Sequence, residues 1–401
     1  MDSRNDPAQP FWPFPASSWL GALSIASLVP AVPFFILDLH GSPLAVTLAA
    51  AVFSVGGFLF TLWAGFLGDR FGARSAALFL SALAIPAGAV LPFVSSVGEL
   101  FPVRFLMAAA VGLEPIILAA VSHQAHLSQS RPMGQISSAK AIGLSAGPLL
   151  PWVIALCFAP SHRFMWIAIA ADLALFASLL VLIGRLGRSS SGRVRADDRP
   201  IETPRELLRS RHLRLLLLMR FVMGASNGIV LAVGALLVAR RFGWGASEYG
   251  LLLGGKTVLL IAVRTALTAR PTLDDRERTI TTASLVLFAL SMVIAQAAER
   301  PSTFVIAYLF TACANAVLPV VTAVMSTRVG SAGRRTSVMG WGAAAFYAGD
   351  LVFTPMGGLL FVVNPRLPFD LVAVGMLSMA AFYGAGVRIN EQGDRGHASI
   401  I

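Results

Sequence analysis

Ionisable side chains inside long apolar stretches are the residues of this chain whose types and positions suggest chemistry. Asp350 and Glu114 are acids in such stretches, and Lys256 is a base in another. A charged group that leaves water is costly, so residues of this kind usually bind a ligand, carry a proton or pair with one another. We expect Asp350 and Glu114 to be protonation sites, and Lys256 to bind a ligand or to exchange partners with them.

Counting residues along these stretches places the charges at two depths, because an α-helix rises about 1.5 Å per residue. Lys256 and Asp350 lie about 10 and 12 Å from the same face of the bilayer, which predicts that they meet. Glu114 lies in a deeper layer that also holds Arg220 and Arg264. The two arginines bind substrate or exchange partners with the acids, or they simply extend toward the inner interface. Fixed structural pairs that only hold helices together are the alternative for all of these charges.

The elements that must position these residues are apolar helices in lipid. Of the 401 residues, 56% are hydrophobic and 13% are charged, and that charged share is about half the share in a soluble domain. A helix that crosses a bilayer takes about 20 residues. Twelve segments of suitable length can be distinguished: 18–37, 44–66, 76–95, 100–121, 139–157, 164–184, 213–238, 247–269, 279–297, 302–325, 337–361 and 367–387.

These segments predict an all-α membrane protein with twelve transmembrane helices. We expect a tail at 1–17, a six-helix bundle at 18–184, an arginine-rich linker at 185–212, a second six-helix bundle at 213–387 and a tail at 388–401. Lys and Arg concentrate in cytoplasmic loops, and 21 of the 31 basic residues fall on the side of both termini, against five in the opposite loops. The prediction is a bacterial-type inner-membrane protein with both termini in the cytoplasm. Because topology explains the positive charge, we expect no nucleic-acid partner.

A glycine-rich, charged motif follows the second segment and reads Gly65-Phe66-Leu67-Gly68-Asp69-Arg70-Phe71-Gly72-Ala73-Arg74. Gly65 allows a neighbouring helix to approach closely, Gly72 permits a tight turn, and Asp69 can meet a helix N-terminus at the membrane edge. The motif resembles the G-x-L-x-D-R-x-G-R-R signature of the major facilitator superfamily, and it occupies the same place in the chain. An ordinary charged loop is the alternative. The resemblance implies a gate formed by Gly65, Asp69, Arg70, Gly72 and Arg74.

The resemblance extends to two further helices. Arg104, which small residues follow, is similar to the arginine of that family's fourth helix, and it is a candidate to bind substrate or to pair with an acid. Gly143, Gly147 and Pro148 resemble the first half of the family's antiporter motif, whereas residues 151–152 depart from it. The resemblance implies two pseudo-symmetric six-helix bundles that rock about a central site, in the branch that is similar to drug/proton antiporters.

The same resemblance also indicates uncharged candidates for the lining of the central cavity. The seventh and tenth helices of the family line its central cavity, which makes Asn227 and Asn315 candidates to hydrogen-bond substrate. Hydrogen bonds to a neighbouring helix are the alternative. Trp341 and Tyr347 are candidates for the apolar wall, although aromatic residues in apolar helices more often only pack.

The sequence contains no metalloprotease, P-loop or nucleophile-elbow motif, so we expect no enzyme. The two cysteines lie in apolar stretches, and the six histidines lie in or near loops. Neither set favours a metal site or a cofactor. We expect proton-coupled efflux of a small amphipathic molecule by a monomer in the lipid bilayer. Proton-coupled uptake of a metabolite, including an anionic one, is the alternative. A non-transporting protein that assembles or regulates another membrane complex is a third interpretation.

Overall fold

The computed structural model describes residues 12–117, 130–186, 211–268, 273–329 and 335–397, and this part of the chain is helical apart from short turns. Twelve of its helical stretches are long and apolar enough to cross a membrane. This confirms the all-α fold with twelve transmembrane helices that the sequence predicts. Large apolar side chains such as Leu173, Leu180 and Phe382 are exposed, as expected for helices that face lipid tails.

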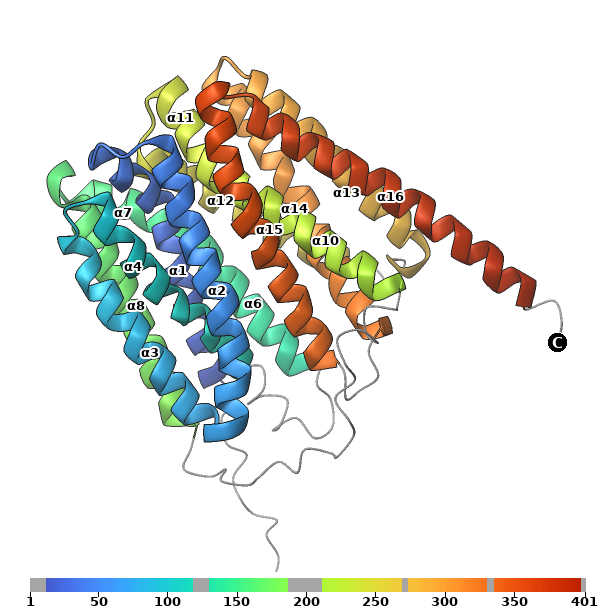
Figure 1. The fold of residues 1–401 in the computed structure, drawn as a ribbon, viewed down its shortest axis with the longest axis horizontal. Helices are drawn as coiled ribbons and strands as arrows, with labels where there is room; N and C mark the ends of the chain where they lie inside the picture. Colours follow the sequence, from blue (N-terminus) through green and yellow to red (C-terminus); the bar gives the residue numbers. More distant parts are fainter. Residues whose placement is uncertain (1–11, 118–129, 187–210, 269–272, 330–334, 398–401) are drawn as a thin grey trace, which may run out of the picture.

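The first six stretches form one bundle, drawn from blue to green in Figure 1. Its helices are α1 (Pro13–Asp38), α2 (Pro43–Phe71), α3 (Ala73–Val90), α4 (Val97–Met107), α6 (Ser130–Ala146), α7 (Leu150–Cys157) and α8 (Arg163–Arg185). Short 3-10 turns continue or connect them: η1 (Leu91–Phe93), η2 (Ala108–Gly112), η3 (Gly147–Leu149) and η4 (Pro160–His162). The fourth and fifth crossings are therefore interrupted helices.

The second six stretches form the other bundle, drawn from yellow-green to red in Figure 1. Its helices are α10 (Arg211–Gly228), α11 (Gly234–Phe242), α12 (Ala246–Thr268), α13 (Leu273–Ala297), α14 (Pro301–Val329), α15 (Arg335–Val363) and α16 (Leu367–His397). A π-helical turn, η5 (Ile229–Val233), joins α10 to α11.

Local sequence explains where several helices begin and end. Pro13 and Pro43 occupy first turns, where a missing N–H costs nothing. The Ser42 side chain caps α2 by accepting the Ala45 N–H at 3.2 Å. Gly72 has a φ of 85° between α2 and α3, which confirms the tight turn that the sequence predicts there.

Several helices extend beyond the predicted segments, and two of them reach into the expected tails. The helix α1 begins at Pro13 rather than at residue 18, so it takes in part of the expected tail at 1–17. The helix α16 continues to His397 rather than ending at 387, so much of the expected tail at 388–401 is helical. Hydropathy marks where a helix leaves lipid and not where its hydrogen bonding ends, which explains both differences.

The two bundles approach each other unequally at the two ends of the molecule. The linker end is the end where α8 finishes at Arg185 and α10 starts at Arg211, and the far end is where α1 finishes and α2 starts. Figure 1 shows the bundles close together at the far end and their helices diverging toward the linker end. The principal contacts between bundles pair α15 with α2, and α12 with α1, α6 and α7.

Glycines allow this close approach in the far half of the molecule. A Cβ atom on Gly250 would overlap the Pro148 carbonyl oxygen, and one on Gly254 would overlap the Leu149 side chain. On the other pair of helices, Gly358 of α15 packs in the same way on Thr47 of α2. Small residues let helices in lipid approach until their backbones touch. We refer to these three contacts as the glycine seam.

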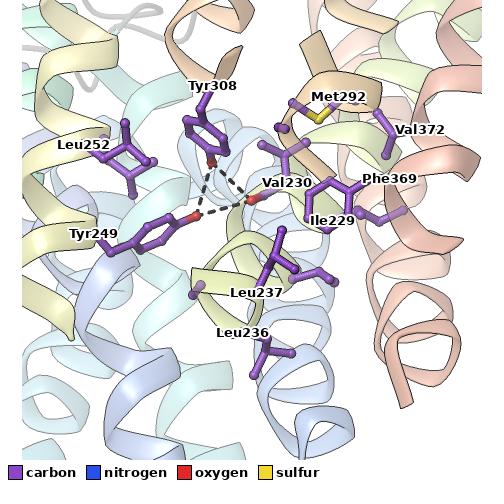
Figure 2. Close-up of a cluster of buried hydrophobic side chains, with 14 of the residues drawn as sticks. Ile229, Val230, Leu236, Leu237, Tyr249, Leu252, Met292, Tyr308, Phe369 and Val372 are labelled. Atoms are coloured by element: carbon purple, nitrogen blue, oxygen red, sulfur yellow. Dashed lines mark hydrogen bonds between the residues drawn. The ribbon is translucent and has the colours of Figure 1, made fainter. Parts of the chain in front are cut away.

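The π-helical turn η5 is held by two buried tyrosines, as Figure 2 shows. The Tyr249 hydroxyl of α12 donates to the Leu231 carbonyl at 2.9 Å, and the Tyr308 hydroxyl of α14 donates to the Val230 carbonyl at 3.2 Å. The two hydroxyl oxygens lie 3.2 Å apart. A π-turn frees backbone groups from the α-helical pattern, and the tyrosines provide the partners that lipid does not.

Candidate functional site

A cavity of about 450 Å³ lies between the two bundles. It is lined by residues of α1, α2, α4, η2, α6, α8 and, from the second bundle, α10, η5 and α15. It reaches from Val46, near the far end, to Ser17 and Ser18 in the first turns of α1 at the linker end. Most of the wall is apolar. The polar lining residues are Ser17, Ser18, Ser54, Arg104, Glu114, Lys140, Ser178, Asn227, Tyr347 and Asp350.

Glu114 lies just after η2 and pairs with Lys140 of α6. The Lys140 Nζ atom donates to both carboxylate oxygens, at 2.5 and 2.6 Å. Both side chains are partly exposed within the cavity, at 42% for Glu114 and 36% for Lys140. Arg220 of α10 is near enough for its charge to interact with that of Glu114 across the two bundles. The hydrogen-bonded partner of Glu114 is therefore Lys140, which the depth argument does not include, whereas Arg220 is an electrostatic neighbour of Glu114, in agreement with the layer that they share.

Lys140 is a site residue that the sequence reasoning missed. Its predicted segment begins at residue 139, which places Lys140 at the membrane edge and out of the list of buried charges. The helix α6 begins at Ser130 instead, so Lys140 lies ten residues inside it. The composition could have drawn attention to Lys140, because Lys140 and Lys256 are the only two lysines among 31 basic residues.

Asp350 of α15 lies where the second bundle meets α2 of the first. One carboxylate oxygen accepts a hydrogen bond from the Ser54 hydroxyl of α2, and the other accepts one from Thr354 at 2.6 Å. Gly228 of α10 packs directly against the same carboxylate, where a Cβ atom would overlap it. Asp350 thus joins three helices from two bundles at the cavity wall.

Lys256 does not meet Asp350, so the pair predicted from their depth is wrong. Lys256 of α12 is only 7% exposed, and its Nζ atom lies 4.8 Å from the centre of the Tyr308 ring on α14. This is the geometry of a cation–π contact. Equal depth does not fix the direction in which a side chain points around its helix, and these two residues face different neighbours.

Arg104 of α4 lies on the cavity wall, with its guanidinium carbon 4.4 Å from the centre of the Phe53 ring on α2. Its Nε atom is buried and has no hydrogen-bond partner among the described residues. Arg220 and Arg264 do not line the cavity. The structure therefore brings one of the three predicted arginines to the cavity wall.

The uncharged candidates divide in the same way. Asn227 of α10 and Tyr347 of α15 line the cavity, and the Tyr347 ring packs on Gly57 of α2. Asn315 of α14 is not among the lining residues, and Trp341 of α15 is 45% exposed outside the cavity. The wall thus draws on the seventh crossing but not on the tenth.

The predicted gate lies at the linker end. Arg70 is exposed, and its guanidinium lies over the rings of Phe66 and Phe71 on its own helix, at 5.9 and 5.5 Å. Arg74 is exposed as well. Gly65 and Asp69 belong to α2, but the surroundings of Gly65 and the side chain of Asp69 lie outside the described part of the structure. The gating role stays a prediction.

The predicted antiporter motif forms a packing face. A Cβ atom on Gly143 would overlap the Trp19 carbonyl oxygen of α1, and one on Gly147 would lie 2.8 Å from the Leu23 carbonyl oxygen. Pro148, the next residue, belongs to the glycine seam. The motif therefore joins α1 to the interface between the bundles.

Comparisons with known proteins agree with this architecture. The family model described as the Major Facilitator Superfamily matches residues 16–263. Among proteins whose function has been curated, none matches the chain in sequence. A solved structure of the nucleoside transporter NupG is similar with a TM-score of 0.74 and 13% identity, covering 94% of this chain and 98% of that one.

Two further solved structures have the same fold. The human organic anion transporter MFSD10 has a TM-score of 0.67 and 16% identity, over 94% of this chain and 100% of that chain. An auto-inhibited peptide transporter of the POT family has a TM-score of 0.72 and 13% identity, over 94% and 96%. At these identities the likeness concerns the fold and not the substrate.

Proposed function

This chain belongs to the Major Facilitator Superfamily, and on that premise we propose that it is a proton-coupled secondary transporter that exports small amphipathic molecules by alternating access. The observation that carries the proposal is the cavity between the bundles, which holds one acid from each: Glu114 from the first and Asp350 from the second. A membrane protein places ionisable groups beside a cavity where they bind or relay charge.

The unequal ends of the molecule support alternating access. The glycine seam brings the bundles together in the far half, while the cavity extends to the first turns of α1 at the linker end. A rocking motion that opens the far end would separate α12 from η3 and α15 from α2. This conformation is then the state that opens toward the linker.

Asp350 is our leading candidate for proton coupling, because its surroundings depend on that motion. Ser54, which donates to its carboxylate, lies on the opposite bundle. Hydrogen bonds to a charged carboxylate favour the charged form, and losing one favours the neutral form. Separation of α2 from α15 would therefore favour uptake of a proton by Asp350, and their return would favour its release.

The direction of transport rests on two different observations. Gly143, Gly147 and Pro148 keep half of the antiporter motif at the bundle interface, which supports efflux in exchange for protons. Arg104 and Lys140 on the cavity wall favour the second candidate, which is uptake of an anionic metabolite together with protons. Transport against an imposed pH gradient of either sign in proteoliposomes, over a panel of compounds, distinguishes the two.

The coupling role is tested with Asp350→Asn, and Glu299→Gln is the control because Glu299 is exposed outside the cavity. We expect Asp350→Asn to abolish gradient-driven accumulation while substrate exchange without a gradient continues. If Asp350→Asn still accumulates substrate with an unchanged pH dependence, Asp350 is structural and Glu114 takes its place as candidate. If Glu114→Gln is equally harmless, coupling through the cavity acids is refuted.

We also propose the orientation that the basic residues predict, with the linker end in the cytoplasm of a bacterial-type inner membrane. A cysteine at Ser190 should then be shielded from an impermeant maleimide added outside cells, whereas one at Glu299 should react. Reaction of the Ser190 cysteine from outside would reverse the orientation.

A further inference from the structure

One basic side chain on the cavity wall makes no ion pair with any acid in the described part of the chain. Both Glu114 oxygens bind Lys140, and the two Asp350 oxygens accept hydrogen bonds from Ser54 and Thr354. Arg104 lines the same cavity, yet within the described ranges it makes no ion pair, and its buried Nε atom has no hydrogen-bond partner. The two acids that line the cavity are therefore already engaged.

The surroundings of Arg104 suit the binding of an anionic group. An arginine stays charged in proteins, and a buried charge without a partner is unfavourable. The Phe53 ring lies under its guanidinium, at 4.4 Å from the guanidinium carbon, and covers one face of the plane, while the Nε donor on the edge has no hydrogen-bond partner among the described residues. The donors on that edge match the two oxygens of a carboxylate or a phosphate.

The other lining residues indicate which kind of molecule fits the cavity beside the anionic group. Arg104 and Glu114 are ten residues apart on the fourth crossing, which corresponds to about 15 Å along the helix axis. The cavity wall also includes the apolar residues Ile25, Val29, Val111 and Leu231. A molecule that fills this space has an anionic group at one end and an apolar body.

We propose that Arg104 binds the anionic group, a carboxylate or phosphate, of an amphipathic substrate whose apolar body extends toward the Glu114–Lys140 pair. This inference rests on the proposed function and specifies its substrate class. It holds for export and for uptake alike. An anionic lipid headgroup has the same chemistry, so the test separates the two sources.

Binding is measured with compounds that share one body and differ in charge. The protein, in nanodiscs of phosphatidylcholine, is titrated with 4-phenylbutyrate, its neutral amide and the cation 4-phenylbutylamine. We expect the carboxylate to bind at least about tenfold more tightly than the other two, since hydrogen bonds between charged groups are the strong ones. Arg104→Gln should lose this preference, and Arg104→Lys should keep part of it because the charge remains without the fork.

Two controls keep the variants interpretable. Arg240→Gln removes an exposed arginine outside the cavity and should leave the preference unchanged. Arg104→Gln should also raise the unfolding temperature of the ligand-free protein, since it removes a buried charge that lacks a partner. A variant that unfolds more readily without ligand would instead identify Arg104 as a structural residue and contradict the inference.

Four binding results would also overturn the inference: equal binding of amide and carboxylate, unchanged carboxylate binding by Arg104→Gln, no binding of any of the three probes, or loss of carboxylate binding when phosphatidylglycerol is added. The last would assign the site to lipid headgroups. Proton-driven transport of neutral or cationic compounds alone would leave the proposed function intact while refuting an anionic substrate. Carboxylates that bind at Arg104 but are never transported would refute the proposed function instead.

Discussion

Gly250 offers a direct test of which conformation the structure represents. In the glycine seam, a Cβ atom at this position would overlap the Pro148 carbonyl oxygen and touch Pro30 at 3.5 Å. The obstacle is backbone in η3, which cannot rotate away as a flexible side chain does. Gly255, five residues later on the same helix, has open space where its Cβ atom would lie. Gly250→Ala and Gly255→Ala are therefore a matched pair.

The size of the effect follows from the packing. Forcing a methyl group into a well-packed contact costs about 1–3 kcal/mol. The cost falls only on the state in which α12 touches η3, because the contact is lost when the far end opens. Gly250→Ala should therefore shift the equilibrium toward the state open at the far end by about 5- to 140-fold, at 1.4 kcal/mol per factor of ten. The shift for Gly255→Ala should be close to none.

Labelling at the far end measures this shift. A Ser247→Cys reporter lies at the same interface, since the Ser247 hydroxyl donates to the Pro151 carbonyl at 3.5 Å. The native Cys157 and Cys313 are first replaced by serine. An impermeant maleimide should modify the reporter faster in Gly250→Ala than in Gly255→Ala. Equal rates in folded protein would refute the argument that the seam closes the far end.

Three further outcomes follow from single contacts. Tyr249→Phe leaves the Leu231 carbonyl of η5 without its hydroxyl donor, so the free energy of unfolding should fall by about 1–3 kcal/mol in a denaturant titration; an unchanged value would mean that the π-turn needs no support. Lys140→Gln should lower the free energy of unfolding by only about 0–1 kcal/mol, because the ion pair is partly exposed. A double-mutant cycle with Glu114→Gln measures the coupling energy of the pair, and additive effects would show that the two side chains do not stabilise each other. Asp69→Asn should slow proteoliposome transport more than it lowers stability, since its carboxylate is expected to gate the linker end; wild-type rates at equal expression would remove that role.

The sequence predicted the parts of this molecule that depend on position along the chain. Apolar length identifies all twelve crossings, and the glycine at 72 marks the turn between α2 and α3. Glu114 and Asp350 reach the cavity, as expected of acids in apolar helices. These properties can be read from residue type and count alone.

The parts that were missed depend on direction around a helix and on distant partners. Depth placed Lys256 level with Asp350, but Lys256 points to the Tyr308 ring instead. Lys140 was excluded because hydropathy set its helix to begin too late. Ser54 carries no signal in sequence, since a serine in an apolar helix commonly bonds its own backbone, and only the fold brings it to Asp350.

The π-turn η5 makes the length of the seventh crossing matter more than its composition. An i→i+5 turn holds one residue more than an α-helical turn, and each residue rotates a helix by about 100°. Deleting one residue from Ile229–Val233 would therefore swing Gly234 away from Tyr249, or Asn227 away from the cavity. A homologue that lacks the turn should show a one-residue gap here. An alignment drawn without that gap would assign cavity-facing positions wrongly on one side of it.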